Sequence, residues 1–110
     1  MFKRLLIISL ILSSFLVGQN RVPNLKLKKM NGKSVMLNSY LSKGPVLINF
    51  WATWCGPCKK EMVYLDKFEK KYSKMGFSIL AISTDSQKSL SQVRSYIWAK
   101  KYKFDVFLDP

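Results

Sequence analysis

The hydrophobic pattern of this chain alternates between short apolar runs and a longer segment with helical spacing. Residues 45–51 (PVLINFW) and 77–83 (FSILAIS) are two such runs, each of a length typical of a buried strand. Between them, apolar residues recur at steps of three and four, which predicts a helix with one buried face. The apolar residues on this face are Met62, Leu65, Phe68, Tyr72 and Met75. Gly76 follows, and we expect it to end the helix as a left-handed cap.

A second helix is predicted from about Ser89 to Lys101, after a capping segment at Asp85 and Ser86. Its apolar positions, which are expected to face the core, are Leu90, Val93, Ile97 and Trp98. The apolar residues from Phe104 onward predict one more strand. Strands that alternate with helices in this way imply parallel, right-handed crossovers.

A β-hairpin is predicted upstream of the first crossover. Asn31-Gly32 is typical of a hairpin turn, and it separates strands expected at 25–28 and 35–37. A short helical turn is expected at 39–41. The predicted fold class is therefore α/β, in the order hairpin, strand, helix, strand, helix, strand.

The amino terminus has the features of an export signal. Lys3 and Arg4 precede an uncharged apolar run from Leu5 to Val17. This run is shorter than the ~20 residues that a membrane-spanning helix needs. We therefore expect residues 1–20 to be a signal peptide or a membrane anchor, and residues 21–110 to form one domain. Either form of the leader places that domain in the periplasm or an equivalent extracytoplasmic space.

The chain contains two cysteines, Cys55 and Cys58, which directly follow the first apolar strand. At the start of a helix, free N–H groups and the helix dipole would stabilise a thiolate on Cys55. Pro57 suits a first helical turn. In this interpretation Cys55 attacks a substrate disulfide and Cys58 resolves the mixed disulfide. Trp54 is expected to be exposed and, with Gly56 and Pro57, to dock partner proteins.

Other uses of the two cysteines fit the sequence less well. A closed zinc site needs four ligands, and the chain supplies two sulfurs and no histidine, so no metal is expected. A structural disulfide across so short a loop would remove little chain entropy. The net charge of +13 is spread along the chain, which is typical of a solvated surface. Scarce arginine and an export signal argue against nucleic acid as a partner.

Residues 50–61 (FWATWCGPCKKE) resemble the active-site segment of the thioredoxin superfamily, and specifically its TlpA/ResA-like thiol-disulfide oxidoreductases, which have a redoxin or AhpC-TSA-like domain. The resemblance extends from about residue 21 to residue 110, since the hairpin and the three strands match in order. It implies a thioredoxin-like fold with an amino-terminal β-hairpin, and no bound cofactor.

The same resemblance implies roles for two further residues. In this branch a glutamate three residues after the second cysteine is credited with handling a proton, and Glu61 matches it. The alternative is an ordinary solvated glutamate beside Lys59 and Lys60. Asn49 stands where cytoplasmic thioredoxin has a buried aspartate, and we expect it to be a hydrogen-bonding core residue. Trp51 is expected to pack in the core.

The family completes its fold with a further hairpin and a carboxy-terminal helix, and this chain ends at Pro110 before both. We therefore expect an incomplete domain with an exposed sheet edge. The resemblance implies an enzyme that reduces disulfides in other exported proteins, in some members during cytochrome c maturation, with electrons from a membrane thiol-disulfide donor. Two alternatives stay open: a truncated, non-catalytic thioredoxin-like binding module and, more distantly, a peroxidase of the peroxiredoxin type.

Overall fold

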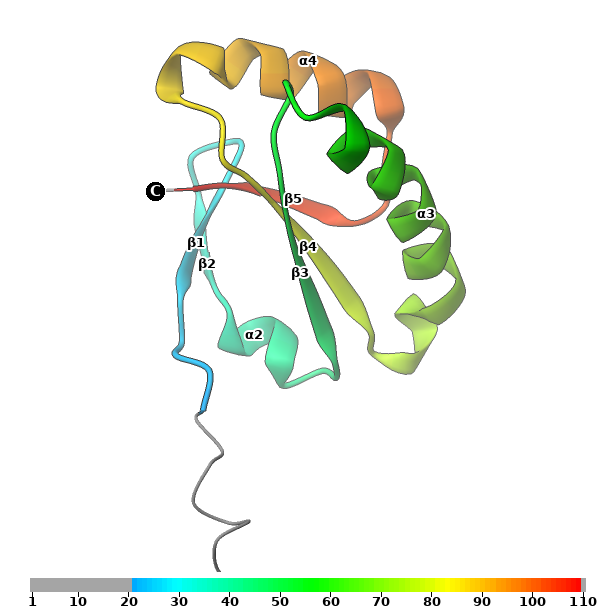
Figure 1. Cartoon of the computed structure of the whole chain (residues 1–110). Coiled ribbons are helices and arrows are strands. Elements are labelled where there is room, and N and C mark those ends of the chain that lie inside the picture. Colours follow the sequence, from blue (N-terminus) through cyan, green and yellow to red (C-terminus); the bar gives the residue numbers. More distant parts are fainter. Residues whose placement is uncertain (1–20, 110) are drawn as a thin grey trace, which may run out of the picture.

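The structure is a computed structural model that describes residues 21–109, and its framework is a five-stranded sheet of order β2-β1-β5-β4-β3 (Figure 1). The strands are β1 (Lys26–Lys29), β2 (Ser34–Met36), β3 (Val46–Trp51), β4 (Ser78–Ser83) and β5 (Asp105–Leu108). The first two strands form the predicted antiparallel hairpin, and the last three run parallel to one another. The predicted α/β order is confirmed, whereas the predicted signal or anchor at 1–20 lies outside the described residues.

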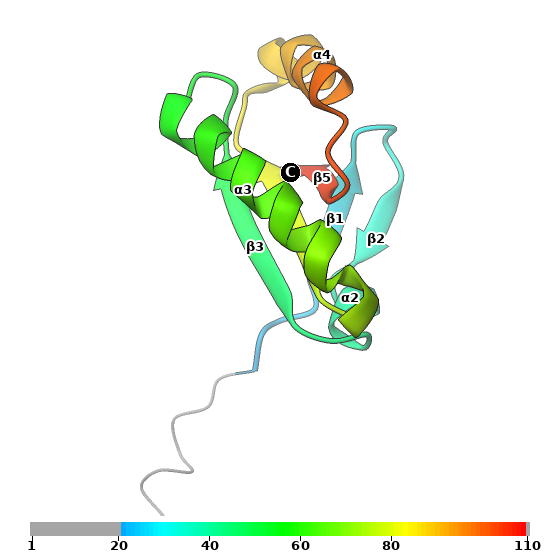
Figure 2. The same ribbon diagram turned by 90° about the vertical axis from the view of Figure 1, so that its right-hand side faces the viewer.

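Helices connect the parallel strands and lie mainly on one face of the sheet (Figure 2). The helical segments are α2 (Asn38–Leu41), α3 (Gly56–Tyr72), η1 (Ser73–Met75), η2 (Gln87–Ser89) and α4 (Leu90–Lys100). Two successive right-handed crossovers in the same direction place α3 and α4 on the same face. Within residues 21–109, none of these helices has the length and apolar character needed to cross a membrane.

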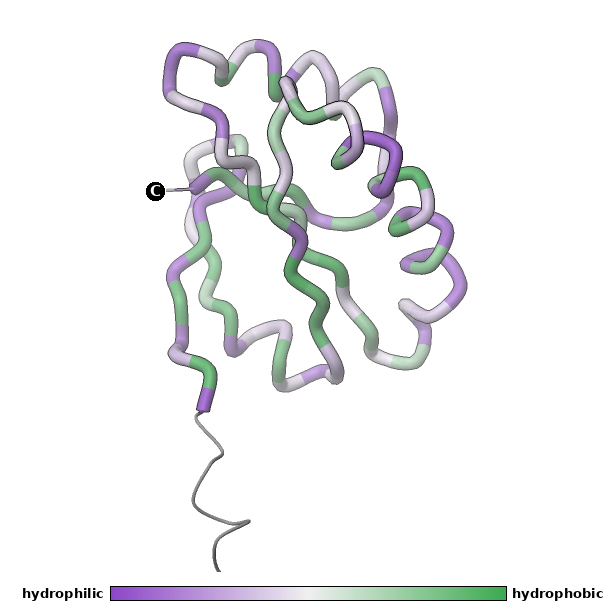
Figure 3. The backbone as a smooth tube through the Cα atoms, viewed as in Figure 1, coloured by the Kyte–Doolittle hydropathy of each residue, from purple (hydrophilic) through white to green (hydrophobic). Residues whose placement is uncertain are grey.

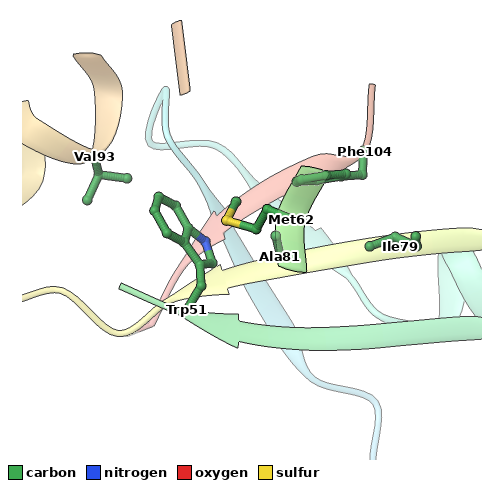
Figure 4. Packing of buried hydrophobic residues seen from close by; sticks show 6 residues of the cluster. All are labelled: Trp51, Met62, Ile79, Ala81, Val93 and Phe104. Carbon is green, nitrogen blue, oxygen red and sulfur yellow. The ribbon is translucent and has the colours of Figure 1, made fainter. Parts of the chain in front are cut away.

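The main hydrophobic core fills the space between the sheet and helices α3 and α4 (Figure 4). Its buried members are Trp51, Met62, Ile79, Ala81, Val93 and Phe104. Figure 3 shows why the strands lie inside: β3 and β4 are mostly hydrophobic, whereas α3 carries hydrophilic positions as well. The prediction that Trp51 packs in the core is confirmed, and this residue places the end of β3 against both helices.

A second cluster occupies the opposite face of the sheet, beneath α2. Its buried residues are Leu27, Leu37, Leu80, Ile82 and Phe107. The ring of Tyr40 meets that of Phe107 edge-on at 6.0 Å, and its hydroxyl donates to Asp105 Oδ2 at 2.7 Å. This face extends to β3, where Phe50 is 61% exposed. β3 is the outermost strand among the described residues, so one of its edges has no strand partner there.

The amino ends of β3 and β4 are held together by two glycines in close contact. Gly76 adopts φ 84°, which confirms the predicted left-handed cap. A Cβ on Gly76 would lie 2.2 Å from the carbonyl oxygen of Lys43, and one on Gly44 would lie 2.5 Å from that of Gly76. Any side chain at either position would therefore push apart the two backbone segments, the one that leads into β3 and the one that leads into β4.

The apolar pattern overestimates the buried face of both helices. On α3, Met62 is buried but Phe68 is 44% exposed, and Met75 is 77% exposed because the α-helix ends at Tyr72 and the chain tightens into η1. The core prediction for Trp98 is wrong, since this residue is 82% exposed.

The physical reason for the error at Trp98 is the orientation of α4. Its inward stripe consists of Val93, Tyr96 and Ile97, and the tilted ring of Tyr96 packs against Trp51 with ring centroids 5.5 Å apart. A residue two positions after Tyr96 is turned by about 200° around a helix and so faces outward. The sequence pattern does not distinguish these two aromatic positions.

Candidate active site at the end of β3

Cys55 stands at the junction between β3 and α3, where it caps the helix. The N–H of Cys58 donates to Cys55 Sγ at 3.3 Å, and Cys55 has an extended backbone (φ −96°, ψ 97°). Pro57 occupies the first turn of α3, as predicted, where its lack of an N–H costs no helical hydrogen bond. The sulfur therefore lies at the positive end of the helix dipole, next to free backbone donors.

The two cysteines form a disulfide, with their Cα atoms 5.3 Å apart. Both residues are half-buried, and Cys58 packs against the core that contains Trp51 and Met62. The predicted docking residues surround the disulfide at the surface: Trp54 is 78% exposed, and Gly56 and Pro57 are exposed as well. The pair is thus covered from the inside and accessible from the outside.

Glu61 lies on the exposed part of α3, one turn after Cys58. The role of Glu61 in proton transfer stays a prediction. Asn49 lies on the strand before the cysteines, and its Nδ2 is buried without a hydrogen-bond partner among the described residues. The expected hydrogen bonding of Asn49 is therefore not met at this nitrogen.

A polar network joins the loop after β3 to the loop after β4. The Asp85 carboxylate accepts from the N–H of Thr53 at 3.0 Å, from the Thr53 hydroxyl, and from the Ser83 hydroxyl at 2.8 Å. The N–H of Asp85 donates back to Ser83 Oγ at 3.1 Å. Sequence reasoning assigned Asp85 to a helix cap. The structure instead directs its carboxylate to the cysteine loop.

The charge of Asp85 follows from these contacts. Burial raises the pKa of Asp85, but hydrogen bonds from Thr53, Ser83 and the Asp85 backbone lower it by more, so the net pKa lies below its usual value. The group is therefore an anion at neutral pH. One sequence signal could have located it: a polar Ser-Thr-Asp run follows an apolar parallel strand, at the sheet edge where the cysteine loop also begins.

An aromatic and cationic group lies behind the disulfide. Trp51 is buried with its Nε1 unpaired among the described residues, and its ring packs against that of Tyr96. Lys59 Nζ lies 5.1 Å and Lys100 Nζ 5.7 Å from the centroid of the Tyr96 ring. These two ammonium groups add positive potential near the start of α3. Residues 21–109 contain no cluster of three or more histidine, cysteine or acidic side chains that could hold a metal ion.

Comparison with known proteins identifies similar sequences over most of the chain. The family model described as "AhpC/TSA family" matches residues 18–110. "Thiol-disulfide oxidoreductase ResA" of Bacillus thuringiensis subsp. konkukian is 36% identical over 87 residues, which are 79% of this chain and 49% of the relative. ResA of Bacillus subtilis is 37% identical over 87 residues, or 79% and 47% of the two chains. The chain spans about half the length of these curated relatives.

Solved structures share the fold. A thiol:disulfide interchange protein from Bacteroides sp. has a TM-score of 0.68 at 31% identity, and the match covers 81% of this chain and 57% of that one. A thioredoxin family thiol:disulfide interchange protein from Chlorobium tepidum has a TM-score of 0.69 at 26% identity, with 84% and 64% covered. The predicted thioredoxin-like fold and the predicted resemblance are therefore confirmed.

Proposed function

We propose that this chain, which belongs to the AhpC/TSA family, is an enzyme that exchanges disulfides with other proteins through Cys55 and Cys58. The observation that carries the proposal is the Cys55–Cys58 disulfide at the amino end of α3, with Cys55 Sγ accepting a helical N–H. The names of the curated relatives, thiol-disulfide oxidoreductases, support the same activity.

The proposed reaction begins with the reduced pair. The Cys55 thiolate attacks one sulfur of a substrate disulfide, which forms a mixed disulfide and releases the other substrate sulfur as a thiolate. Cys58 then loses its proton and attacks Cys55, so that the Cys55–Cys58 disulfide forms and the second substrate thiol leaves. The substrate gains two electrons, and its two thiolates take up two protons, one released by Cys58 and one from solvent, while the protein dithiol is oxidised. In this scheme Glu61 accepts the proton of Cys58.

The direction and location of this exchange are the finer part of the proposal. The basic start and apolar run of residues 1–17 support export to a periplasmic or other extracytoplasmic space, where residues 5–17 would tether the domain to the membrane if the leader is not cleaved. The Gly56-Pro57 pair between the cysteines supports reduction rather than oxidation of partners. We propose that the substrates are disulfides of exported proteins, including those of cytochrome c maturation, and that a membrane thiol-disulfide donor restores the dithiol.

The surface around the disulfide supports a protein as the substrate. Trp54 projects into solvent beside Cys55, and the exposed Gly56 and Pro57 leave the sulfur open to approach. A large exposed aromatic side chain next to a reactive group is typical of a contact that contributes strongly to protein binding. We propose that these three residues contact the chain on either side of the substrate disulfide.

The test of this function is a trapping experiment with the full 110-residue chain. Reduced Cys58→Ser protein is mixed with insulin, whose disulfides serve as the probe, and the product is identified by mass before and after dithiothreitol. We expect a mixed disulfide through Cys55 that accumulates because resolution is blocked. Cys55→Ser is the matched control and should trap at least ten times less. Equal trapping by the two variants, or none by either, contradicts the proposal and favours a non-catalytic binding module.

A further inference from the structure

We propose that Asp85 is a positioning residue for the cysteine pair: by holding Thr53 through two hydrogen bonds, it fixes the loop that presents Cys55 when the disulfide is open. This inference rests on the proposed disulfide exchange. Asp85 touches neither sulfur in the contacts described above, so its action passes through the backbone of the loop. Asp85 lies outside the sequence motif around the cysteines, 27 residues after Cys58.

The segment that leads from β3 to Cys55 is hydrogen-bonded to the residues that follow β4 at two places. The carbonyl oxygen of Trp51 accepts from the N–H of Thr84 at 2.9 Å and from its hydroxyl at 3.3 Å. Two residues later, the N–H and the hydroxyl of Thr53 both donate to Asp85. The segment after β4 therefore holds the strand end and the loop at once.

The loop itself is a tight turn, so its anchor controls the next residues. The N–H of Cys55 donates to the carbonyl oxygen of Ala52 at 3.1 Å, which closes the turn around Thr53. Ala52 is buried, and Thr53 and Asp85 are half-buried, so the anchoring bonds are partly protected from water. A displacement of Thr53 would be transmitted to Cys55 across this single turn.

The anchor matters most in the reduced protein. In the oxidised protein the covalent bond to Cys58 holds Cys55 in place. Once that bond is reduced, the start of α3 still holds Cys55, whose carbonyl oxygen accepts from the N–H of Lys59 at 3.2 Å, and the loop contacts fix the side of Cys55 that precedes the helix. The proximity of the two sulfurs sets the effective concentration of one thiol for the other, and hence the equilibrium between the dithiol and the disulfide. A loosened loop lowers this effective concentration and makes the disulfide less favourable.

The experiment measures that equilibrium in the full chain with glutathione. Protein dithiol and oxidised glutathione yield protein disulfide and two reduced glutathione molecules, and the species are counted by alkylation and mass. We expect Asp85→Ala to lower the equilibrium constant about fivefold, which is roughly 20 mV at 29.6 mV per tenfold change. Asp85→Asn should stay within twofold of the unmodified protein, because its amide oxygen can accept from the Thr53 N–H while its NH2 donates to the Thr53 hydroxyl.

Glu69→Ala is the matched control for a purely structural loss. Glu69 Oε2 accepts from the N–H of Ile79 at 2.8 Å, so this variant also loses a carboxylate that binds the backbone near β4, but at the far end of that strand. The equilibrium constant of Glu69→Ala should be unchanged. An effect of Asp85→Ala no larger than that of Glu69→Ala overturns the inference. An Asp85→Asn variant as impaired as Asp85→Ala also overturns it, since charge rather than position would then be the cause.

Thr53→Val keeps the test decisive if Asp85→Ala does not fold. This substitution preserves the shape of the side chain and the N–H, and removes one of the two bonds to Asp85. We expect it to lower the equilibrium constant about twofold, and an unchanged constant contradicts the inference. Insulin reduction by the unmodified protein is measured alongside. Its absence would defeat the proposed function, whereas its presence with unchanged constants would defeat the role of Asp85 alone.

Discussion

The two ends of the β3–β4 pair are both fixed by close contacts, but by contacts of different kinds. At the amino end, Gly44 and Gly76 let two backbone segments touch. At the carboxyl end, Asp85 accepts hydrogen bonds from the loop that leads to Cys55. Close backbone contact is the main feature of the first end, and one carboxylate, that of Glu69, supports it through a hydrogen bond from the Ile79 N–H. Polar side chains fix the second end, which is where open parallel sheets commonly place their chemistry.

The two carboxylates near the ends of β4 show the same contrast in their titration. Burial raises the pKa of Glu69, and its hydrogen bond from Ile79 offsets only part of that effect. Burial also raises the pKa of Asp85, but four hydrogen bonds more than compensate. The difference shows that several donors lower the pKa of the half-buried Asp85 below its usual value, whereas the single donor at Glu69 does not offset the effect of burial.

The strongest way to break the amino end is Gly76→Ala. The new methyl group would lie 2.2 Å from the Lys43 carbonyl oxygen, and alanine is strained at φ 84°. We expect a loss of about 3 kcal/mol in the free energy of unfolding, measured by urea denaturation of the oxidised protein. The glutathione equilibrium constant of the folded fraction should be unchanged, because the cysteine loop lies at the other end.

Gly32→Ala is the matched control for Gly76→Ala. Gly32 has a similar φ of 87°, but a Cβ there meets no atom within 4 Å. Its expected cost is about 1 kcal/mol, from the left-handed backbone alone. Similar losses in the two alanine variants would show that the contact between Gly44 and Gly76 has room for a side chain.

Acid should selectively weaken the carboxyl end. Because the folded pKa of Asp85 lies below the unfolded value of 3.8, its contribution to stability is present above pH 3.8 and is lost as the pH falls through the folded pKa. Asp85→Asn removes this dependence. The stability advantage of the unmodified protein over Asp85→Asn should therefore shrink between pH 5 and pH 2, as followed by urea denaturation at each pH. A constant advantage contradicts the ionised state of Asp85.

The amino end should respond to pH in the opposite sense. The folded pKa of Glu69 lies above the unfolded value of 4.5, so its contribution to stability falls as the pH rises from 4.5 through the folded pKa. Glu69→Gln can retain the acceptor for the Ile79 N–H without a charge. Relative to the unmodified protein, it should gain stability between pH 4.5 and pH 7. A relative loss over this interval would show that the Ile79 bond requires the charge.

The smallest effect is expected at Trp98, far from both strand ends. Its side chain is 82% exposed on α4, so Trp98→Ala should change the free energy of unfolding by less than about 0.5 kcal/mol. Val93→Ala, on the buried stripe of the same helix, should cost about 2 kcal/mol and is the control. A loss at Trp98 as large as that at Val93 would contradict the exposed position of the Trp98 side chain.

Local patterns in the sequence predict most of this fold. Asn31-Gly32 indicates the hairpin, Gly76 indicates the end of the helical segment, and the apolar runs indicate the parallel strands. These features can be predicted because each of them depends on neighbouring residues only. The core prediction for Trp98 fails because the rotation of α4 about its axis depends on the contact between Tyr96 and Trp51, which lie far apart in the sequence.

The candidate site divides in the same way: its local part can be predicted from the sequence, and the part that depends on a contact between distant residues cannot. The Cys55–Cys58 spacing and Pro57 are local signals, and their position at the start of α3 follows directly. The bond from Thr53 to Asp85 joins residues 32 positions apart and depends on β3 and β4 lying side by side. Sequence reasoning without that register has no means of pairing them.

The measurement that tests the central claim most directly is the redox equilibrium of Cys55 and Cys58 in the native and the urea-denatured chain. Both are titrated with glutathione and counted by alkylation and mass. We predict that the native equilibrium constant differs from the denatured one by at least tenfold, about 30 mV, because the capped helix and the anchored loop act only in the folded protein. Coincident constants would mean that the fold does not tune the cysteine pair, and would contradict the account.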